Sequence, residues 1–262
     1  MVRVRLDQLL CQRGVYPSRT RAAASVMAGE VLLGPERRRA HKPGQLVAAD
    51  VALEVAAATA YASRGGIKLA NALDALGVAV RGRHALDVGA STGGFTDCLL
   101  QRGATHVVAL DVAYGQLDWK LRGDQRVTVV ERCNARFLDA AQLPYAPELV
   151  VIDVSFISVV KLLPAVLGCS APVFDCLALV KPQFEVGREG VGKGGVVRDA
   201  ALRRSALVAV GEAARELGAA VLGYASSGLP GPKGNQESFV WLAESSRGGV
   251  QDVRTAALAA EP

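Results

Sequence analysis

The sequence predicts an α/β protein: a doubly wound, mostly parallel sheet of seven strands, preceded by a small α+β module. After about residue 64, short and nearly continuous apolar runs alternate with helical stretches, which is typical of a parallel sheet covered on both faces. The length of 262 residues allows one large domain and a small second one. We therefore expect two domains.

Residues 1–56 predict a pair of helices and a small hairpin. A leucine stripe at helical spacing ends before Gly14, and a second helix is expected between an N-cap at Ser18 and a C-cap at Gly29. The residues of the second helix that we expect to face inward are Ala22, Val26 and Met27. Two apolar runs, 31–33 and 51–55, predict strands separated by a basic turn, ERRRAHKPG.

Positive charge is concentrated in this first segment. Residues 1–56 hold nine Lys and Arg against five Asp and Glu, whereas the rest of the chain holds 21 against 20, so four of the five net positive charges lie there. A basic module joined to a nearly neutral body is typical of a protein that binds a polyanion. The alternative is a basic face that is merely solvated.

The same segment resembles the S4 RNA-binding domain over about residues 3–56. The resemblance is carried by RLD at 5–7, the pair Ser18-Arg19, a glycine before a strand, and Ala49-Asp50 before the last strand. It departs from the family at 34–36, where the chain has Gly-Pro-Glu and the family often has Asn-Gly. The resemblance implies contacts to RNA phosphates by Arg5, Arg19, Arg21, Arg37, Arg38, Arg39 and Lys42.

An Ala-rich segment without helical periodicity predicts a linker over 57–63, followed by a second domain over 64–262. The strands of this domain are expected at 84–90, 105–112, 127–131, 149–155, 174–181, 220–227 and 237–244. The last two are joined only by GLPGPKGNQ, which is too short for a parallel crossover. The last strand should therefore run antiparallel.

The stretch DVGASTGGFT at 87–96 fits more than one kind of site. Its Gly89-Ala90-Ser91-Thr92-Gly93 matches the G-x-S-x-G of serine hydrolases, but the three histidines at 41, 84 and 106 cannot supply a triad in the required order. A dinucleotide-binding loop would need glycine at Ser91. We therefore predict a cofactor loop at the carboxyl end of the first strand, with an ordinary tight turn as the alternative.

An acid at the end of the next strand supports this prediction. Asp111 lies 22 residues beyond Gly89 and can accept hydrogen bonds from a ribose diol. The sequence thus indicates a cofactor that contains adenosine.

Seven strands with a reversed last strand resemble the sheet of S-adenosylmethionine-dependent methyltransferases. Six motifs carry a closer resemblance, namely SRGGIKL, DVGASTGGFTDCLL, LDVAYGQL, DVSFIS, LVKPQFEVG and LPGPKGNQE. They resemble the TlyA family of ribosomal RNA 2'-O-methyltransferases, which join an S4 domain to an FtsJ-like domain. The resemblance implies that S-adenosyl-L-methionine (SAM) is held by Asp87, Gly89, Ser91, Gly93, Gly94, Phe95, Asp111, Asn134 and Asp153. Asp87 would hold the methionine amino group and Asn134 would contact adenine.

The residues after the fourth and fifth strands favour a hydroxyl as the methyl acceptor. The chain has DVSF at 153–156 instead of the D/N-P-P-Y/F of amino-directed methyltransferases, and Cys176 is expected to be buried within a strand. A lysine and an aspartate at neighbouring strand ends suit deprotonation of a hydroxyl. The family's Lys-Asp-Lys-Glu set falls on Lys68, Asp153, Lys181 and Glu237.

These four residues have expected roles in methylation of a cytidine ribose in ribosomal RNA. We expect Lys181 to accept the proton of the 2'-hydroxyl and Asp153 to orient Lys181. Lys68 and Glu237 would position the ribose, and a purely structural ion pair between them is the alternative. The glycine-rich segment 182–195 is expected to be a mobile flap that contacts RNA, or else disordered. RNA contacts outside the first segment are expected from Arg64, Lys193 and Lys233.

Cysteine usage and hydropathy limit the other possibilities. The five cysteines form no C-x-x-C pair and are odd in number, so we expect neither a zinc site nor a disulfide framework, and no metal. The sequence shows no signal peptide or spanning segment, so we expect a cytoplasmic protein without a membrane partner. The alternatives are a membrane-active protein, because relatives carry haemolysin labels, and a Rossmann oxidoreductase, which Ser91 in the loop disfavours.

Overall fold

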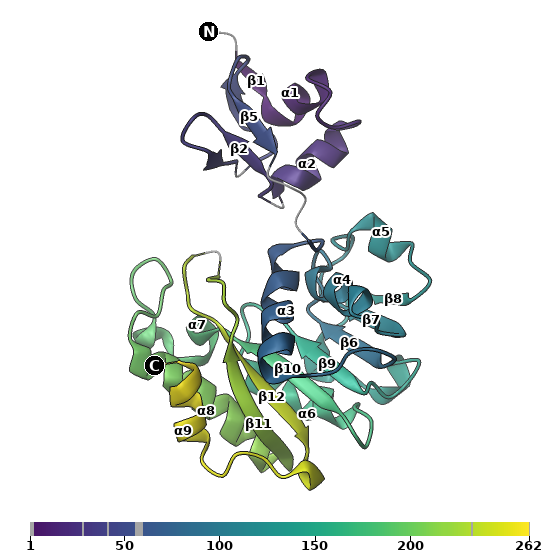
Figure 1. Ribbon diagram of the computed structural model, residues 1–262, viewed down its shortest axis with the longest axis vertical. Helices are drawn as coiled ribbons and strands as arrows, with labels where there is room; N and C mark the ends of the chain where they lie inside the picture. The colour runs from purple at the N-terminus through teal and green to yellow at the C-terminus, as the bar shows by residue number, and fades with distance from the viewer. Residues whose placement is uncertain (1–2, 28, 41, 56–59, 232, 262) are drawn as a thin grey trace. The chain divides into compact units, whose positions relative to one another are not determined.

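The computed structural model describes residues 3–27, 29–40, 42–55, 60–231 and 233–261. The chain forms two compact units, Met1–Arg64 and Gly65–Pro262 (Figure 1). The division into 1–56, 57–63 and 64–262 stays a prediction, and residues 57–59 of its linker lie outside the described residues.

The smaller unit combines two helices with short strands. Its elements are β1 (Arg3–Arg5), α1 (Leu6–Gln12), α2 (Arg19–Met27), β2 (Val31–Leu33), β3 (Arg38–Arg39), β4 (Leu46–Ala48) and β5 (Leu53–Val55). β2 pairs antiparallel with both β3 and β5, and β1 pairs antiparallel with β4. The two helices and the strand pair are confirmed, but the basic segment contains β3 and is not only a turn.

One inward-facing residue of α2 was predicted wrongly. Ala22 and Val26 are buried in the core of the unit together with Leu6 and Leu10, whereas Met27 is 71% exposed. Positions 22 and 26 lie on one face of the helix because they are four residues apart, and position 27 lies about 100° further around it.

The larger unit is a seven-stranded sheet with helices on both faces. Its helices are α3 (Arg64–Leu76), α4 (Gly94–Gln101), α5 (Trp119–Arg122), α6 (Leu163–Gly168), α7 (Pro182–Glu185), α8 (Ala200–Glu216) and α9 (Val253–Ala260). Its strands are β6 (His84–Val88), β7 (His106–Leu110), β8 (Val127–Val130), β9 (Leu149–Ile152), β10 (Asp175–Val180), β11 (Ala219–Ser226) and β12 (Ser238–Glu244). Short 3-10 turns lie at Ala135–Phe137, Ala140–Gln142, Val159–Lys161, Arg188–Gly190 and Ser245–Arg247.

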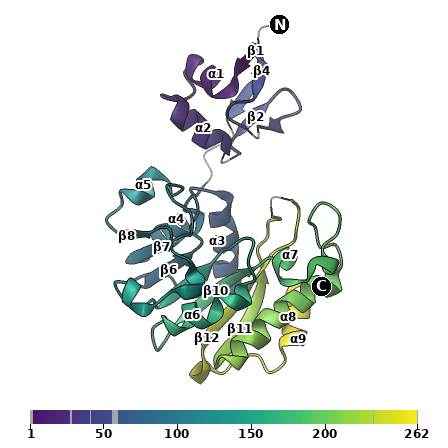
Figure 2. The same cartoon turned by 180° about the vertical axis from the view of Figure 1, so that it is seen from behind.

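The strand order confirms the predicted sheet. It is β11-β12-β10-β9-β6-β7-β8, and β12 runs antiparallel to both of its neighbours. α3 and α4 cover the face toward the viewer in Figure 1, and α6 and α8 cover the opposite face, seen in Figure 2. Every residue of β9 and β10 is buried, because these central strands are covered from both sides. No helix in the described ranges is long and apolar enough to cross a membrane.

The sheet reverses its order beside β6, and this reversal places the site. The chain adds β7 and β8 on one side of β6 and then β9 and β10 on the other. Ligands of open α/β sheets bind at such a switch point, outside the carboxyl ends of the strands. Gly89 follows β6 and Asp153 follows β9, so both lie at this edge.

Candidate active site

The loop between β6 and α4 has a backbone that requires glycine. Gly89 and Gly93 have φ of 88° and 95°, where side chains are strained. A Cβ at Gly89 would lie 2.4 Å from the carbonyl oxygen of Asp153, and one at Gly93 would lie 2.2 Å from Leu121 Cδ1. The glycines therefore allow this loop to pass close to β9 and α5.

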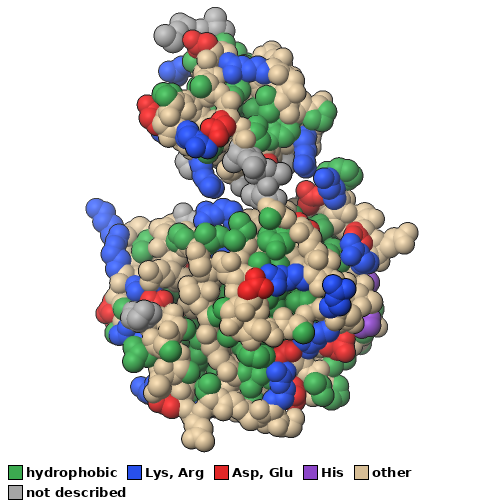
Figure 3. All heavy atoms as spheres, viewed as in Figure 1, with side chains coloured by type: hydrophobic (Ala, Val, Ile, Leu, Met, Phe, Trp, Pro, Cys, Tyr) green, Lys and Arg blue, Asp and Glu red, His purple; other side chains and the backbone are tan. Residues whose placement is uncertain are grey.

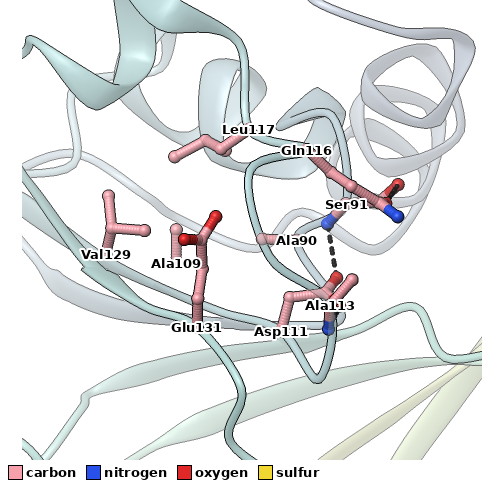
Figure 4. A pocket seen from close by; sticks show the side chains of 9 residues that line it. All are labelled: Ala90, Ser91, Ala109, Asp111, Ala113, Gln116, Leu117, Val129 and Glu131. Atoms are coloured by element: carbon pink, nitrogen blue, oxygen red, sulfur yellow. Dashed lines mark hydrogen bonds between the residues drawn. The ribbon is translucent and has the colours of Figure 1, made fainter.

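A pocket lies between this loop and the ends of β7 and β8 (Figure 4). It is lined by Ala90, Ser91, Ala109, Asp111, Ala113, Gln116, Leu117, Val129 and Glu131. The two oxygens of Asp111 accept hydrogen bonds from the backbone N–H groups of Ser91 and Ala113, both at 2.7 Å. Each oxygen keeps a second lone pair, so the fixed carboxylate can still accept hydrogen bonds from a ribose diol.

The structure adds Glu131 to this pocket, a residue that was not predicted from the sequence. Glu131 follows β8, and its Oε1 accepts hydrogen bonds from Gly115 N, at 2.8 Å, and from the Arg122 guanidinium. An acid directly after the third strand, matching Asp111 after the second, is the signal that could have found it. Asn134 caps the next turn through Arg136 N and is not among the lining residues, so its adenine contact stays a prediction.

Two further residues of the predicted cofactor set belong to α4. Gly94 is the first residue of the helix, and Phe95 is buried and packs against Phe239, with 5.8 Å between ring centroids. The side chain of Phe95 is therefore part of the core.

Asp87 is a buried acid with an unused oxygen. Its Oδ2 accepts a hydrogen bond from Thr96 Oγ1 at 2.7 Å, whereas Oδ1 has no hydrogen-bond partner among the described residues. Burial raises the pKa of Asp87 to about 7, aided by the Asp153 and Asp111 carboxylates and opposed by the Thr96 hydrogen bond. A buried carboxylate with a free oxygen suits an ammonium ion, so the residue fits the amino group of SAM.

The predicted catalytic residues form two pairs at the same edge of the sheet. Lys181 Nζ lies 2.6 Å from Asp153 Oδ1 and donates a hydrogen bond to Ser155 Oγ at 3.0 Å. Lys68, on α3, donates to Glu237 Oε2, and both residues are buried. Val180 of β10 is paired with Ser238 of β12 in an antiparallel ladder. Lys181, which follows Val180, and Glu237, which precedes Ser238, both lie just beyond this last pair.

The predicted RNA-binding residues are mostly on the surface. Arg5 and Arg19 both bond to the buried Asp7, and the Arg5 hydrogen bond, with support from Arg19, holds the pKa of Asp7 well below its usual range. These two arginines thus stabilise the start of α1.

The other predicted RNA contacts differ in their partners and exposure. Arg37 is paired with Glu54 at 2.6 Å and Arg38 with Glu36 at 3.4 Å, and Arg21 and Arg64 are half-buried. The other predicted contacts are all exposed: Arg39, Lys42, Lys193 and Lys233. Figure 3 shows Lys and Arg interspersed with Asp and Glu on both units.

The serine-hydrolase alternative does not fit the described residues. His84 and His106 are the first residues of β6 and β7 and so lie at the amino edge of the sheet. Ser91 lies beyond the carboxyl edge, at the opposite end of the same strand, and His41 lies outside the described residues. Ser91 instead donates to Gln116 Oε1 at 3.3 Å.

Comparisons with known proteins agree with this geometry. The FtsJ-like methyltransferase family matches residues 61–244. The chain is 50% identical over 242 residues to 16S/23S rRNA (cytidine-2'-O)-methyltransferase TlyA of Mycobacterium tuberculosis, covering 92% of this chain and 90% of that protein. It is 38% identical over 237 residues to Hemolysin A of Brachyspira hyodysenteriae, covering 89% and 97%. A solved structure from Streptococcus thermophilus that carries a hemolysin name superposes with a TM-score of 0.75 and 36% identity, covering 99% and 96%. The chain therefore belongs to the FtsJ-like methyltransferase family, in the group that includes TlyA.

Proposed function

We propose that this protein transfers the methyl group of SAM to the ribose 2'-hydroxyl of a cytidine in ribosomal RNA. The observation that carries the proposal is the position of Lys181, which is held by Asp153 and Ser155 at the sheet edge beside the glycine loop. The name of the Mycobacterium tuberculosis relative supports the substrate.

The loop and strand ends at this edge have the groups that SAM needs. Asp87 would bind the amino group of SAM, and Asp111 would bind its ribose diol. The turn at Gly89 and Gly93 would let the loop backbone approach SAM closely. When bound, SAM supplies a methyl group that is electrophilic because it is attached to a sulfonium. The protein must still orient and deprotonate the acceptor.

The contacts of Lys181 suit a proton acceptor. A neutral amine has two N–H donors and one lone pair. Ser155 accepts from one donor at 3.0 Å, and Asp153 Oδ1 lies 2.6 Å from Nζ as an ion-pair partner, so these contacts leave the lone pair of a neutral Lys181 unused. In that state the amine would take the proton from the 2'-hydroxyl as the methyl group passes from the sulfonium sulfur to the 2'-oxygen.

Lys68 and Glu237 would hold the acceptor ribose so that its 2'-hydroxyl is in line with the methyl group of SAM. Glu237 Oε1 is buried without a hydrogen-bond partner among the described residues, and Oε2 is held by Lys68. A Cβ at Gly231 would lie 2.2 Å from Oε1, so only glycine at that position leaves room for the carboxylate itself. Such an oxygen can accept a hydrogen bond from a substrate hydroxyl.

The proposal is tested by tritium transfer from methyl-labelled SAM into ribosomal RNA, followed by mapping of the modified nucleotide. We expect label on the 2'-oxygen of a cytidine. Label on a base, or no label in either subunit's RNA, would contradict the proposal.

Asp111→Ala should weaken SAM binding by roughly 10- to 100-fold, because the variant cannot form the hydrogen bonds between the ribose diol and a charged carboxylate. Isothermal titration calorimetry measures this affinity directly. The matched control is Asp252→Ala, which removes an exposed acid that caps α9. Unchanged affinity in Asp111→Ala would remove the ribose role.

The smaller unit should contribute affinity for RNA and no chemistry. We expect Arg38→Gln/Arg39→Gln to make the salt dependence of RNA binding less steep, by about 0.7 to 0.9 for each phosphate that the variant no longer neutralises. Filter binding over a series of KCl concentrations measures the slope. Arg126→Gln/Arg254→Gln removes the same charge from the larger unit, and an equal effect there would assign the result to total charge.

A further inference from the structure

Two loops of the larger unit are joined by one buried side chain. The segment that follows α7 forms a tight bridge between Gly192 and Val196, and a second loop joins β11 to β12. Asn235, 2% exposed, accepts a hydrogen bond from Val197 N at 2.9 Å and donates one to Gly195 O at 2.8 Å. The segment expected to be a mobile flap is thus tied to the loop that precedes Glu237.

A cleft between these loops has three cationic side chains in its lining: Arg198, Arg203 and Lys233. Its lining residues are Val196, Val197, Arg198, Arg203, Lys233, Gly234 and Gln236, none of them acidic. A Cβ at Gly192 would lie 3.5 Å from an Arg198 guanidinium nitrogen, and one at Gly195 would lie 3.4 Å from Lys233 Nζ. The two charged groups therefore lie against the same tight turn.

The three cations differ in what they bind. The Arg203 guanidinium is used within the protein, because it pairs with Glu261 at 2.7 Å and donates to the carbonyl oxygen of Arg198, also at 2.7 Å. It thereby fixes the backbone of Arg198. Arg198 and Lys233 are exposed, and their charged groups form no ion pair with another described residue. Two cations that lie against one tight turn, neither paired with a carboxylate of the described residues, repel each other and attract an anion.

We propose that this cleft binds one backbone phosphate of the RNA substrate, next to the nucleotide that is methylated. The proposal rests on the function proposed above. An arginine fork and a lysine suit a phosphate, and none of the described lining residues is an aromatic on which a base could stack. Gln236 lines the cleft and is followed by Glu237, so the phosphate would be bound one residue along the chain from the proposed ribose contact. Such a contact positions RNA without reading its sequence.

The test uses full-length Arg198→Gln, Lys233→Gln and the double variant. We expect the double variant to make the slope of log affinity against log KCl less steep by about 0.7 to 0.9, the value for one phosphate. The KM for RNA should rise by about tenfold, with kcat and SAM affinity close to wild type. Arg254→Gln, which removes an exposed arginine of α9, is the control.

The outcomes separate this inference from the proposed function. Wild-type slope and KM in the double variant would overturn the phosphate site, and so would an equal change in Arg254→Gln. A slope change of twice the expected size would overturn the assignment to a single phosphate. RNA binding is measured without methyl transfer, so the slope tests the cleft even if wild type transfers no label to RNA, whereas that result would contradict the proposed function alone.

Discussion

Lys181→Ala is expected to abolish methyl transfer while SAM affinity stays close to wild type. The side chain contacts Asp153 and Ser155 and lies outside the pocket of Asp111, so its removal deletes the proton acceptor and leaves that pocket in place. General base catalysis contributes typically 10²- to 10⁴-fold, and we expect a loss of at least this size. Lys181→Arg should fail equally, because a guanidinium does not lose a proton at working pH.

Single-turnover tritium transfer at saturating RNA measures the chemical step, and calorimetry measures SAM affinity. Lys161→Ala, an exposed lysine at the end of a 3-10 turn, is the matched control and should transfer at the wild-type rate. Near-normal turnover in Lys181→Arg would show that the residue only stabilises charge. The proton would then have to go to solvent or to Asp153.

The sheet could be predicted closely because burial on both faces leaves a strong local signal. β9 and β10 are buried throughout, so their sequences are apolar with little interruption, and both strands lie inside their predicted ranges. The signal that ends β6 is also local, because Gly89, with φ of 88°, stops the strand. In contrast, β1 and β4 have three residues each and partly exposed side chains, and their pairing joins residues more than 40 positions apart. No local pattern encodes such a pairing.

The site residues were predictable where they follow directly from strand order. Asp111, Asp153 and Lys181 come after the ends of β7, β9 and β10, and parallel strands bring their carboxyl ends to one edge. The Arg198 and Lys233 cleft depends instead on Asn235, which links two loops 38 positions apart. The contact between Ser155 and Lys181 was equally hidden, because it depends on side-chain geometry across neighbouring strands.

Asp87→Asn is expected to make the protein more stable at pH 8 while it weakens SAM binding. Burial raises the pKa of Asp87 from 3.8 to about 7 in the folded protein. Between these values the unfolded chain has released the proton and the folded protein retains it, so the free energy of unfolding falls as pH rises. The fall is about 1.4 kcal/mol per pH unit, and the total by pH 8 is roughly 2–4 kcal/mol. An asparagine cannot ionise and can still accept from Thr96.

Urea unfolding at pH 5 and pH 8 measures the stability, and calorimetry at pH 6 and pH 8 measures SAM affinity. The stability advantage of Asp87→Asn should be large at pH 8 and much smaller at pH 5. Wild-type affinity for SAM should rise as Asp87 ionises, and the variant should bind roughly 10- to 100-fold more weakly at pH 8 because it cannot form the charged hydrogen bond.

A second buried acid, Asp175, serves as a control for which the opposite change in stability is expected. Asp175 accepts hydrogen bonds from Arg83, Trp241 and Arg247, so its charge is compensated and Asp175→Asn should lower stability at pH 8. Asp87 differs because its Oδ1 has no hydrogen-bond partner among the described residues. If Asp87→Asn were less stable than wild type at pH 8, the carboxylate would have to be compensated within the protein itself. Its Oδ1 would then not be reserved for the amino group of SAM.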